Sequence, residues 1–148
     1  MRTTATYTTK VLTLENLSNY EVVLGFMADI YSSKYESKLD LRNLDLRQYV
    51  KHGRVVLVID EVAQLIMGVY LAQVYRASLD PTKRICYQDL MWARSPRAFK
   101  MLMDDFLTFG RLSADHIISM VGPTANLSEK SMRKLGFTPV ETLYRIEV

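Results

Sequence analysis

The middle of the chain constrains the fold most, because three runs with strand-like patterning follow one another there. Turn signals separate them: Asp60-Glu61 begins the first turn and Asp80-Pro81 marks the second. Strands joined by such short connections pair as an antiparallel meander. The three runs are 54–60, which is β-branched and apolar, 64–76, which is long and carries Gly68, and 84–92. A glycine inside a strand predicts a bulge or a close backbone approach at Gly68.

The segments before the meander predict one strand and two helices. Residues 7–14 alternate between branched and polar side chains, which predicts a first strand. A short helix is expected from Asp45 to His52, and Gly53 is suited to stop it. The first helix is expected from Leu17 onward, and its apolar face consists of Tyr20, Val23, Leu24, Met27, Ile30 and Tyr31.

After the meander the chain alternates between helix and strand. Ser95-Pro96 is a strong helix start, since serine caps free amides and proline fits the first turn. A short apolar strand at 116–121 comes next, and a last strand is expected at 140–148. Asn126 and Glu129 begin the intervening helix, which Gly136 ends. The buried stripe of the long helix is expected to be Phe99, Leu102, Met103, Phe106 and Phe109.

This order of elements predicts an α/β fold with a mixed sheet: an antiparallel meander, then a parallel strand-helix-strand unit, with helices on both faces. A chain of 148 residues fits one domain, spanning 1–148.

Composition narrows the classes of function. The net charge of +3 is scattered along the chain, so nucleic-acid binding is not expected. No apolar run is long enough for a membrane span, and the N-terminus does not have the pattern of a secretory signal, so we expect a cytoplasmic protein. The single cysteine, Cys86, is expected to be a buried thiol, and with His52 and His116 it makes no metal site.

Two segments resemble the GNAT N-acetyltransferases, and the order of elements agrees over nearly the whole chain. The first is the strand end and turn 87–97, Tyr-Gln-Asp-Leu-Met-Trp-Ala-Arg-Ser-Pro-Arg. The second is the late helix 126–137, which ends in Lys-Leu-Gly-Phe. The resemblance implies that the backbone of Leu90, Met91 and Trp92 binds the acyl-pantetheine arm of acetyl-CoA. The following turn would then hold the pyrophosphate.

The phosphate loop departs from the pattern of that family, which reads Gln/Arg-x-x-Gly-x-Gly/Ala. Here Arg97 is retained, but Lys100 and Leu102 occupy both glycine places, so the amide cradle for acetyl-CoA is incomplete. In place of that cradle, the Ser95 hydroxyl and the cations of Arg94, Arg97 and Lys100 are expected to attract the diphosphate. The alternative is that Ser95 only caps the helix while the cations are solvated.

The late helix also departs from the resemblance. Met132 occupies the place of the tyrosine that in many members protonates the leaving thiolate. Some members have methionine there and a serine in the place of Ser128. Asn126 lies one position from the usual asparagine and either contributes to the cofactor site or caps the helix.

An amine acceptor must lose a proton before it attacks a thioester, so a base is needed. Asp89 precedes the apolar residues 90–92, and apolar surroundings make a carboxylate a stronger base. Strand alternation places Asp89 on the same face as Tyr87 and Met91. The alternative for Asp89 is an ion pair with an arginine, and Asp115 and His116 are the other candidate bases.

The resemblance therefore implies an acyl-CoA-dependent N-acetyltransferase with Asp89 as base and the amine of a small molecule or protein as acceptor. The competing interpretation is a GNAT-like protein of bacteriophage type that has lost catalysis and binds a host protein. The acceptor groove is either open or completed by a second subunit as a homodimer.

Overall fold

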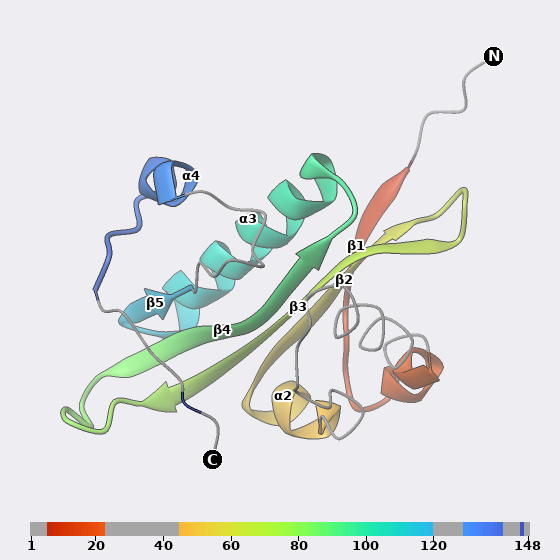
Figure 1. The fold of residues 1–148 in the computed structure, drawn as a ribbon. Helices are drawn as coiled ribbons and strands as arrows, with labels where there is room; N and C mark the ends of the chain where they lie inside the picture. The colour runs from red at the N-terminus through yellow and green to blue at the C-terminus, as the bar shows by residue number, and fades with distance from the viewer. Residues whose placement is uncertain (1–5, 23–44, 120–128, 141–145, 147–148) are drawn as a thin grey trace.

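The computed structural model describes residues 6–22, 45–119, 129–140 and 146. These residues form a five-stranded sheet in the order β1-β2-β3-β4-β5, with helices packed on it (Figure 1). The strands are β1 (Tyr7–Val11), β2 (Gly53–Asp60), β3 (Leu65–Arg76), β4 (Arg84–Ala93) and β5 (His116–Ile118). The helices are the 3-10 helix η1 (Leu17–Asn19), α2 (Leu46–His52), α3 (Pro96–Ser113) and α4 (Glu129–Lys134).

The sheet is mixed, as the sequence predicts. The first four strands pair antiparallel in chain order, and β4 then pairs parallel with β5 after the α3 crossover. In Figure 1, α3 covers one face of the sheet, while η1 and α2 lie on the opposite face. The predicted mixed sheet with helices on both faces is therefore confirmed.

Each face of the sheet has its own apolar core. On the α3 face, Leu102, Met103 and Phe106 pack against Val56 and Tyr70, all at most 1% exposed. The core on the opposite face, where η1 and α2 lie, contains six buried aliphatic residues: Leu12, Leu17, Val55, Leu57, Val69 and Leu71. Cys86 lies in the α3-side core as expected, and burial raises the pKa of its thiol to about 11.

The start of α3 follows its local sequence. The Ser95 hydroxyl accepts a hydrogen bond from the Ala98 N–H at 3.1 Å, and Pro96 is the first helical residue. The predicted stripe faces the sheet, with Leu102, Met103 and Phe106 buried and Phe99 and Phe109 packed beside them.

The sequence predicts that Gly53 stops helix α2, but the structure requires glycine at this position for a different reason. A helix-stopping glycine adopts a positive φ, but Gly53 has a φ of −164° and is already the first residue of β2. A Cβ at this position would lie 1.9 Å from the Ala72 carbonyl oxygen of β3. The position therefore requires glycine because the two backbones approach so closely.

Gly136 ends α4 as predicted. Its φ is +95°, its N–H donates to the Arg133 carbonyl, and the Phe137 N–H donates to the Met132 carbonyl at 3.1 Å. These two bonds form the Schellman motif that favours glycine at this position.

One boundary differs from the prediction. The first strand ends at Val11 and not at residue 14, because Asn16 folds back: its side chain accepts from the Thr13 N–H at 2.8 Å and donates to the Val11 carbonyl at 3.2 Å. The following helix starts at Leu17 as a short 3-10 turn.

Several predicted segments lie outside the described residues. These are most of the first helix beyond residue 22, the end of the strand at 116–121, the start of the late helix including Asn126, and nearly all of the strand at 140–148. In the described part of the chain, no helix combines the length and apolar character needed to cross a membrane.

Candidate functional site

A β-bulge in β4 determines where Asp89 lies. In the β3–β4 ladder, Leu71 is opposite Leu90, whereas the next residue, Ala72, is opposite Gln88. Asp89 is therefore the extra residue of β4, without a partner of its own on β3. The bulge interrupts the alternation of side chains along β4.

The bulge overturns one prediction about faces. Strand alternation placed Asp89 and Met91 on one face, but Met91 packs against the core under α3, while Leu90 and Trp92 pack against the opposite core. Asp89 contacts α2 on the same side of the sheet as Leu90. The extra residue shifts the register by one position, which reverses the face of every side chain after it.

The Asp89 carboxylate is half-buried and held by two neutral donors. The Tyr49 hydroxyl of α2 and the Gln73 side-chain amide of β3 both donate to its Oδ2 oxygen, each at 2.5 Å. The other oxygen, Oδ1, accepts no hydrogen bond from any of the described residues. The ion pair with an arginine, which the sequence left open, does not form among these residues.

Tyr49 remains a proton donor over a wide pH range. Burial, then the hydrogen bond to Asp89 and the charge of that carboxylate, raise the pKa of the phenol far above its usual value. The phenol therefore stays protonated at neutral pH and keeps Asp89 Oδ2 occupied. This leaves Oδ1 as the oxygen that can accept another proton.

The carboxyl-terminal half of β4 extends beyond its partner strand. Pairing between β4 and β5 ends at Tyr87 and Ile118, after which the Ser119 hydroxyl donates to the Gln88 side-chain oxygen at 2.5 Å. Within the described part of the chain, Leu90 to Trp92 pair with β3 on one edge and with no strand on the other. Figure 1 shows β4 continuing from this point to the turn that begins α3.

The two arginines of this turn lie on aromatic rings. The Arg94 guanidinium carbon is 5.5 Å from the centroid of the Trp92 ring, and that of Arg97 is 4.6 Å from the centroid of the Tyr7 ring. Both arginine side chains are exposed. Cation–π contacts of this kind orient a guanidinium group over the ring face.

The backbone amides of the turn are largely satisfied from within. The Ala98 N–H donates to the Ser95 hydroxyl and the Phe99 N–H donates to the Ser95 carbonyl at 3.0 Å, while Pro96 has no N–H. The Ser95 side chain therefore occupies the place where an anion would meet the helix amides.

The two residues in the glycine places of the family motif lie inside α3 and not in the turn. Lys100 is exposed and its amine is 3.4 Å from the Asp104 carboxylate, whereas Leu102 is fully buried in the core. Their side chains therefore do not close the turn. The Ser95 cap, which the sequence did identify, is what fills it.

The other residues that the sequence offered for catalysis lie in surroundings typical of structural residues. Asp115 Oδ2 accepts from the Arg84 N–H at 2.8 Å, and His116 is exposed at the start of β5. Met132 is 5% exposed on α4. In the described ranges, no three His, Cys, Asp or Glu side chains are grouped in a way that would hold a metal ion.

Sequence reasoning missed Tyr49 and Gln73. Gln73 carries a weak signal, because it lies two residues after Leu71 and so shares its inward face. Tyr49 carries none, since nothing in a seven-residue helix indicates which strand residue it will contact 40 positions later.

A scan of family models finds no match for the sequence, and a search of curated proteins finds none either. Solved structures do share the fold. A crystal structure described as a probable acetyltransferase matches with a TM-score of 0.70 at 16% identity, over 95% of this chain and 97% of that one.

Two further structures come from named acetyltransferases. One from Trypanosoma brucei matches with a TM-score of 0.65 at 18% identity, over 97% of this chain and all of that one. The aminoglycoside N-acetyltransferase AAC(6')-Iy, solved with CoA, matches with a TM-score of 0.68 at 12% identity, over 100% and 98% of the two chains. At these identities the likeness establishes that this chain has the acetyltransferase fold.

Proposed function

We propose that the protein is an acyl-CoA-dependent N-acetyltransferase in which Asp89 is the general base. One observation carries the proposal: Tyr49 and Gln73 hold Asp89 Oδ2, while Oδ1 accepts no hydrogen bond from the described residues. A carboxylate with one fixed and one open oxygen is positioned to receive a proton from a bound amine. Its place on the bulge of β4 is beside the strand edge that has no described partner.

The reaction requires one bond to form and one to break. The acceptor ammonium gives a proton to Asp89, and its nitrogen then forms a bond to the acetyl carbonyl carbon of the thioester. The nitrogen loses its second proton to water as the amide forms, the carbon–sulfur bond breaks, and the thiolate takes up a proton. Met132 cannot supply that proton, so it comes from the protonated Asp89 or from water.

Acetyl-CoA would supply the acetyl thioester, and the chain offers it a strand edge and positive charge. The backbone of Leu90, Met91 and Trp92 has an edge that pairs with none of the described strands and would receive the pantetheine amides. The side chains that would face the pyrophosphate are those of Arg94, Arg97 and Lys100, which are exposed, and that of Ser95, which is partly buried. Since Ser95 already caps the helix amides, we expect the side-chain cations to provide most of the attraction.

The acceptor is proposed to be the primary amine of a small molecule. A carboxylate beside a tyrosine attracts an ammonium group before it removes the proton. The aminoglycoside acetyltransferase that shares this fold was solved with CoA, and another with sisomicin, which is itself a small-molecule amine. This likeness supports the class of acceptor, and a protein amine is the alternative.

Calorimetric titration of the purified protein with acetyl-CoA tests the cofactor, and a thiol-release assay with a panel of amines tests the chemistry. We expect micromolar binding that an Arg97→Glu variant weakens at least tenfold. Asp89→Asn should bind acetyl-CoA as the wild type does but lower kcat by about 10²- to 10⁴-fold. If acetyl-CoA does not bind at millimolar concentration, the enzyme proposal is wrong, and a catalytically inactive binding protein is the better explanation.

A further inference from the structure

A cleft of about 410 Å³ opens at the start of β4, at the opposite end of that strand from the turn that precedes α3. Four of its lining residues carry basic groups: Lys51, His52, Arg76 and Arg84. No aspartate or glutamate is among the lining residues. A concave surface with charge of one sign concentrates ions of the opposite sign.

Arg76 and Arg84 both line this cleft and oppose each other directly. They are partners in the β3–β4 ladder, where like charges face to face are destabilising. Both side chains are exposed, and neither makes a hydrogen bond or an ion pair within the described ranges. The two charges are therefore uncompensated by this part of the chain.

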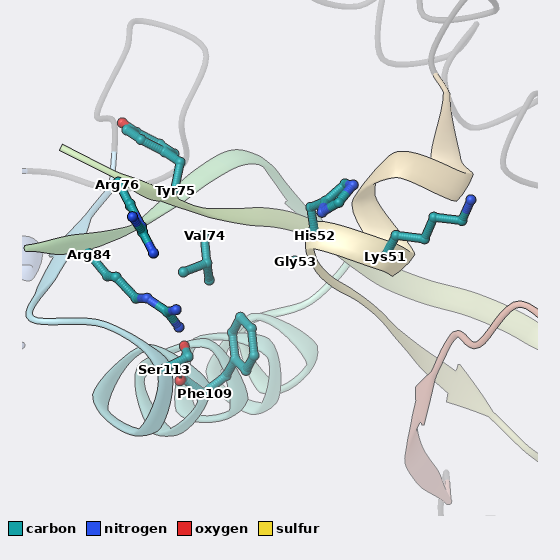
Figure 2. A pocket seen from close by; sticks show the side chains of 9 residues that line it. All are labelled: Lys51, His52, Gly53, Val74, Tyr75, Arg76, Arg84, Phe109 and Ser113. Carbon is teal, nitrogen blue, oxygen red and sulfur yellow. Dashed lines mark hydrogen bonds between the residues drawn. The ribbon is translucent and has the colours of Figure 1, made fainter. Parts of the chain in front are cut away.

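Figure 2 shows how the side chains converge. The guanidinium groups of Arg76 and Arg84 turn into the same space, near Ser113 at the end of α3. Val74 and Phe109 contribute an apolar wall beside them, while Lys51 points away. The Ser113 hydroxyl donates to the Phe109 carbonyl at 2.6 Å, so the arginines are the donors that an anion would meet.

Two carboxylates of neighbouring elements, Asp105 and Asp115, are already engaged elsewhere. Asp105 accepts two hydrogen bonds from Arg54, at 2.9 and 3.1 Å. Asp115 accepts from the backbone N–H of Arg84 and not from its guanidinium. Neither carboxylate therefore neutralises the pair of arginines.

We propose that this cleft binds a small molecule through a phosphate group held by Arg76 and Arg84. Two guanidinium forks match the charge and the oxygen geometry of a phosphate dianion. The volume falls in the range of small-molecule sites, and the apolar wall accommodates the organic part. A nucleic-acid surface would instead require cations spread along a stripe.

Thermal unfolding in inorganic phosphate, compared with chloride at equal pH and ionic strength, tests the site. Phosphate should raise the Tm of the wild type by a few degrees, because it binds only the folded state. Arg76→Gln and Arg84→Gln should each abolish most of that rise. Arg111→Gln, an exposed arginine of α3 outside the cleft lining, is the matched control and should retain it.

The variants also separate binding from a structural role. Without phosphate, Arg76→Gln should be at least as stable as the wild type, since it removes a repulsion. Arg84→Lys, which keeps the charge but loses the fork, should weaken phosphate binding about tenfold and provides a second variant. A phosphate effect that Arg97→Gln abolishes and Arg76→Gln does not would belong to the proposed acetyl-CoA site and would contradict this one.

The class of ligand is tested by competition. Ribose 5-phosphate should bind more tightly than inorganic phosphate if the apolar wall contributes, and equal affinities would assign the site to free phosphate. An equal rise in Tm for the wild type and Arg76→Gln, or no rise at all, would refute the site. Binding of a single-stranded oligonucleotide 100-fold tighter than ribose 5-phosphate would assign the arginines to nucleic acid and overturn the small-molecule proposal.

Discussion

Tyr49 of α2 donates a hydrogen bond to Asp89 of β4 at 2.5 Å, across 40 residues of sequence and on the face of the sheet opposite α3. Gln73 donates to the same oxygen from β3. Three separate elements therefore fix the orientation of one carboxylate. That carboxylate is also the residue that the β4 bulge removes from the regular ladder.

Removing the Tyr49 hydroxyl should affect catalysis through Asp89. We expect Tyr49→Phe to lower kcat about tenfold with little change in KM, because Asp89 loses one of the two donors that orient it. The deciding measurement is the pH profile of kcat/KM, which should shift in the variant. A purely structural role of Tyr49 would leave that profile unchanged. Tyr75→Phe, in an exposed tyrosine, is the control and should match the wild type.

Asp105 should matter far more for stability than its neighbour Asp104. Asp105 is a partly buried partner of Arg54 and Tyr70, whereas Asp104 is exposed and pairs with Lys100. Asp105→Asn should reduce the free energy of unfolding by about 2–4 kcal/mol, since it leaves a partly buried guanidinium without its counter-charge. Asp104→Asn should cost less than about 0.5 kcal/mol. Urea unfolding of both variants checks the difference, and equal values would contradict it.

A methyl group at Gly53 should be poorly tolerated. The added Cβ of Gly53→Ala would meet the Ala72 carbonyl oxygen at 1.9 Å, and backbone atoms cannot yield as a side chain can. We expect a loss of about 2–3 kcal/mol or more in the free energy of unfolding. Gly136→Ala is the comparison: nothing lies within 4 Å of its added Cβ, but the φ of +95° should cost about 1 kcal/mol. Chemical denaturation of the two variants would show whether this order holds.

Stability should fall at alkaline pH because Cys86 is buried. Burial raises the pKa of the thiol from 9.0 to about 11, so the folded state holds its proton more tightly than the unfolded state does. The contribution of this thiol to the free energy of unfolding is fully present below pH 9. About 2–3 kcal/mol of it is lost as the pH rises from 9 to 11. Burial raises the pKa of Tyr70 as well, which acts in the same direction at higher pH.

The comparison with Cys86→Ala isolates the thiol. Between pH 9 and 11 the wild type should lose stability more steeply than the variant, by up to about 1.4 kcal/mol per pH unit. The slopes are compared and not the absolute values, since the variant also leaves a small cavity. Parallel slopes would mean that the thiol does not contribute.

The features that the sequence predicted correctly depend on short-range interactions. The start of α3 at Ser95 and Pro96 and the glycine that ends α4 each follow from hydrogen bonds within four or five residues. Gly68 was expected at a bulge or a close approach, and the structure has both: the β2–β3 register shifts beside it, and an added Cβ would lie 2.8 Å from the Trp92 carbonyl.

The features that the sequence did not predict depend on which strand lies opposite a given residue. The alternation of β4 placed Asp89 with Met91, and the bulge that separates them comes from the pairing with β3. The glycine at 53 was assigned to a helix end, whereas its real constraint is the Ala72 carbonyl of another strand. The unbalanced pair of Arg76 and Arg84 likewise exists only once the ladder register is set.

The sequence by itself determined the order of strands and helices, the antiparallel meander and the helix that follows it, because periodicity and capping act between residues that are near in the chain. Tertiary structure alone decided the face of Asp89, its contacts with Tyr49 and Gln73, and the meeting of two arginines at the far end of the sheet. The reason is that strand register is a joint property of two segments. A single extra residue in one of them redirects every side chain that follows.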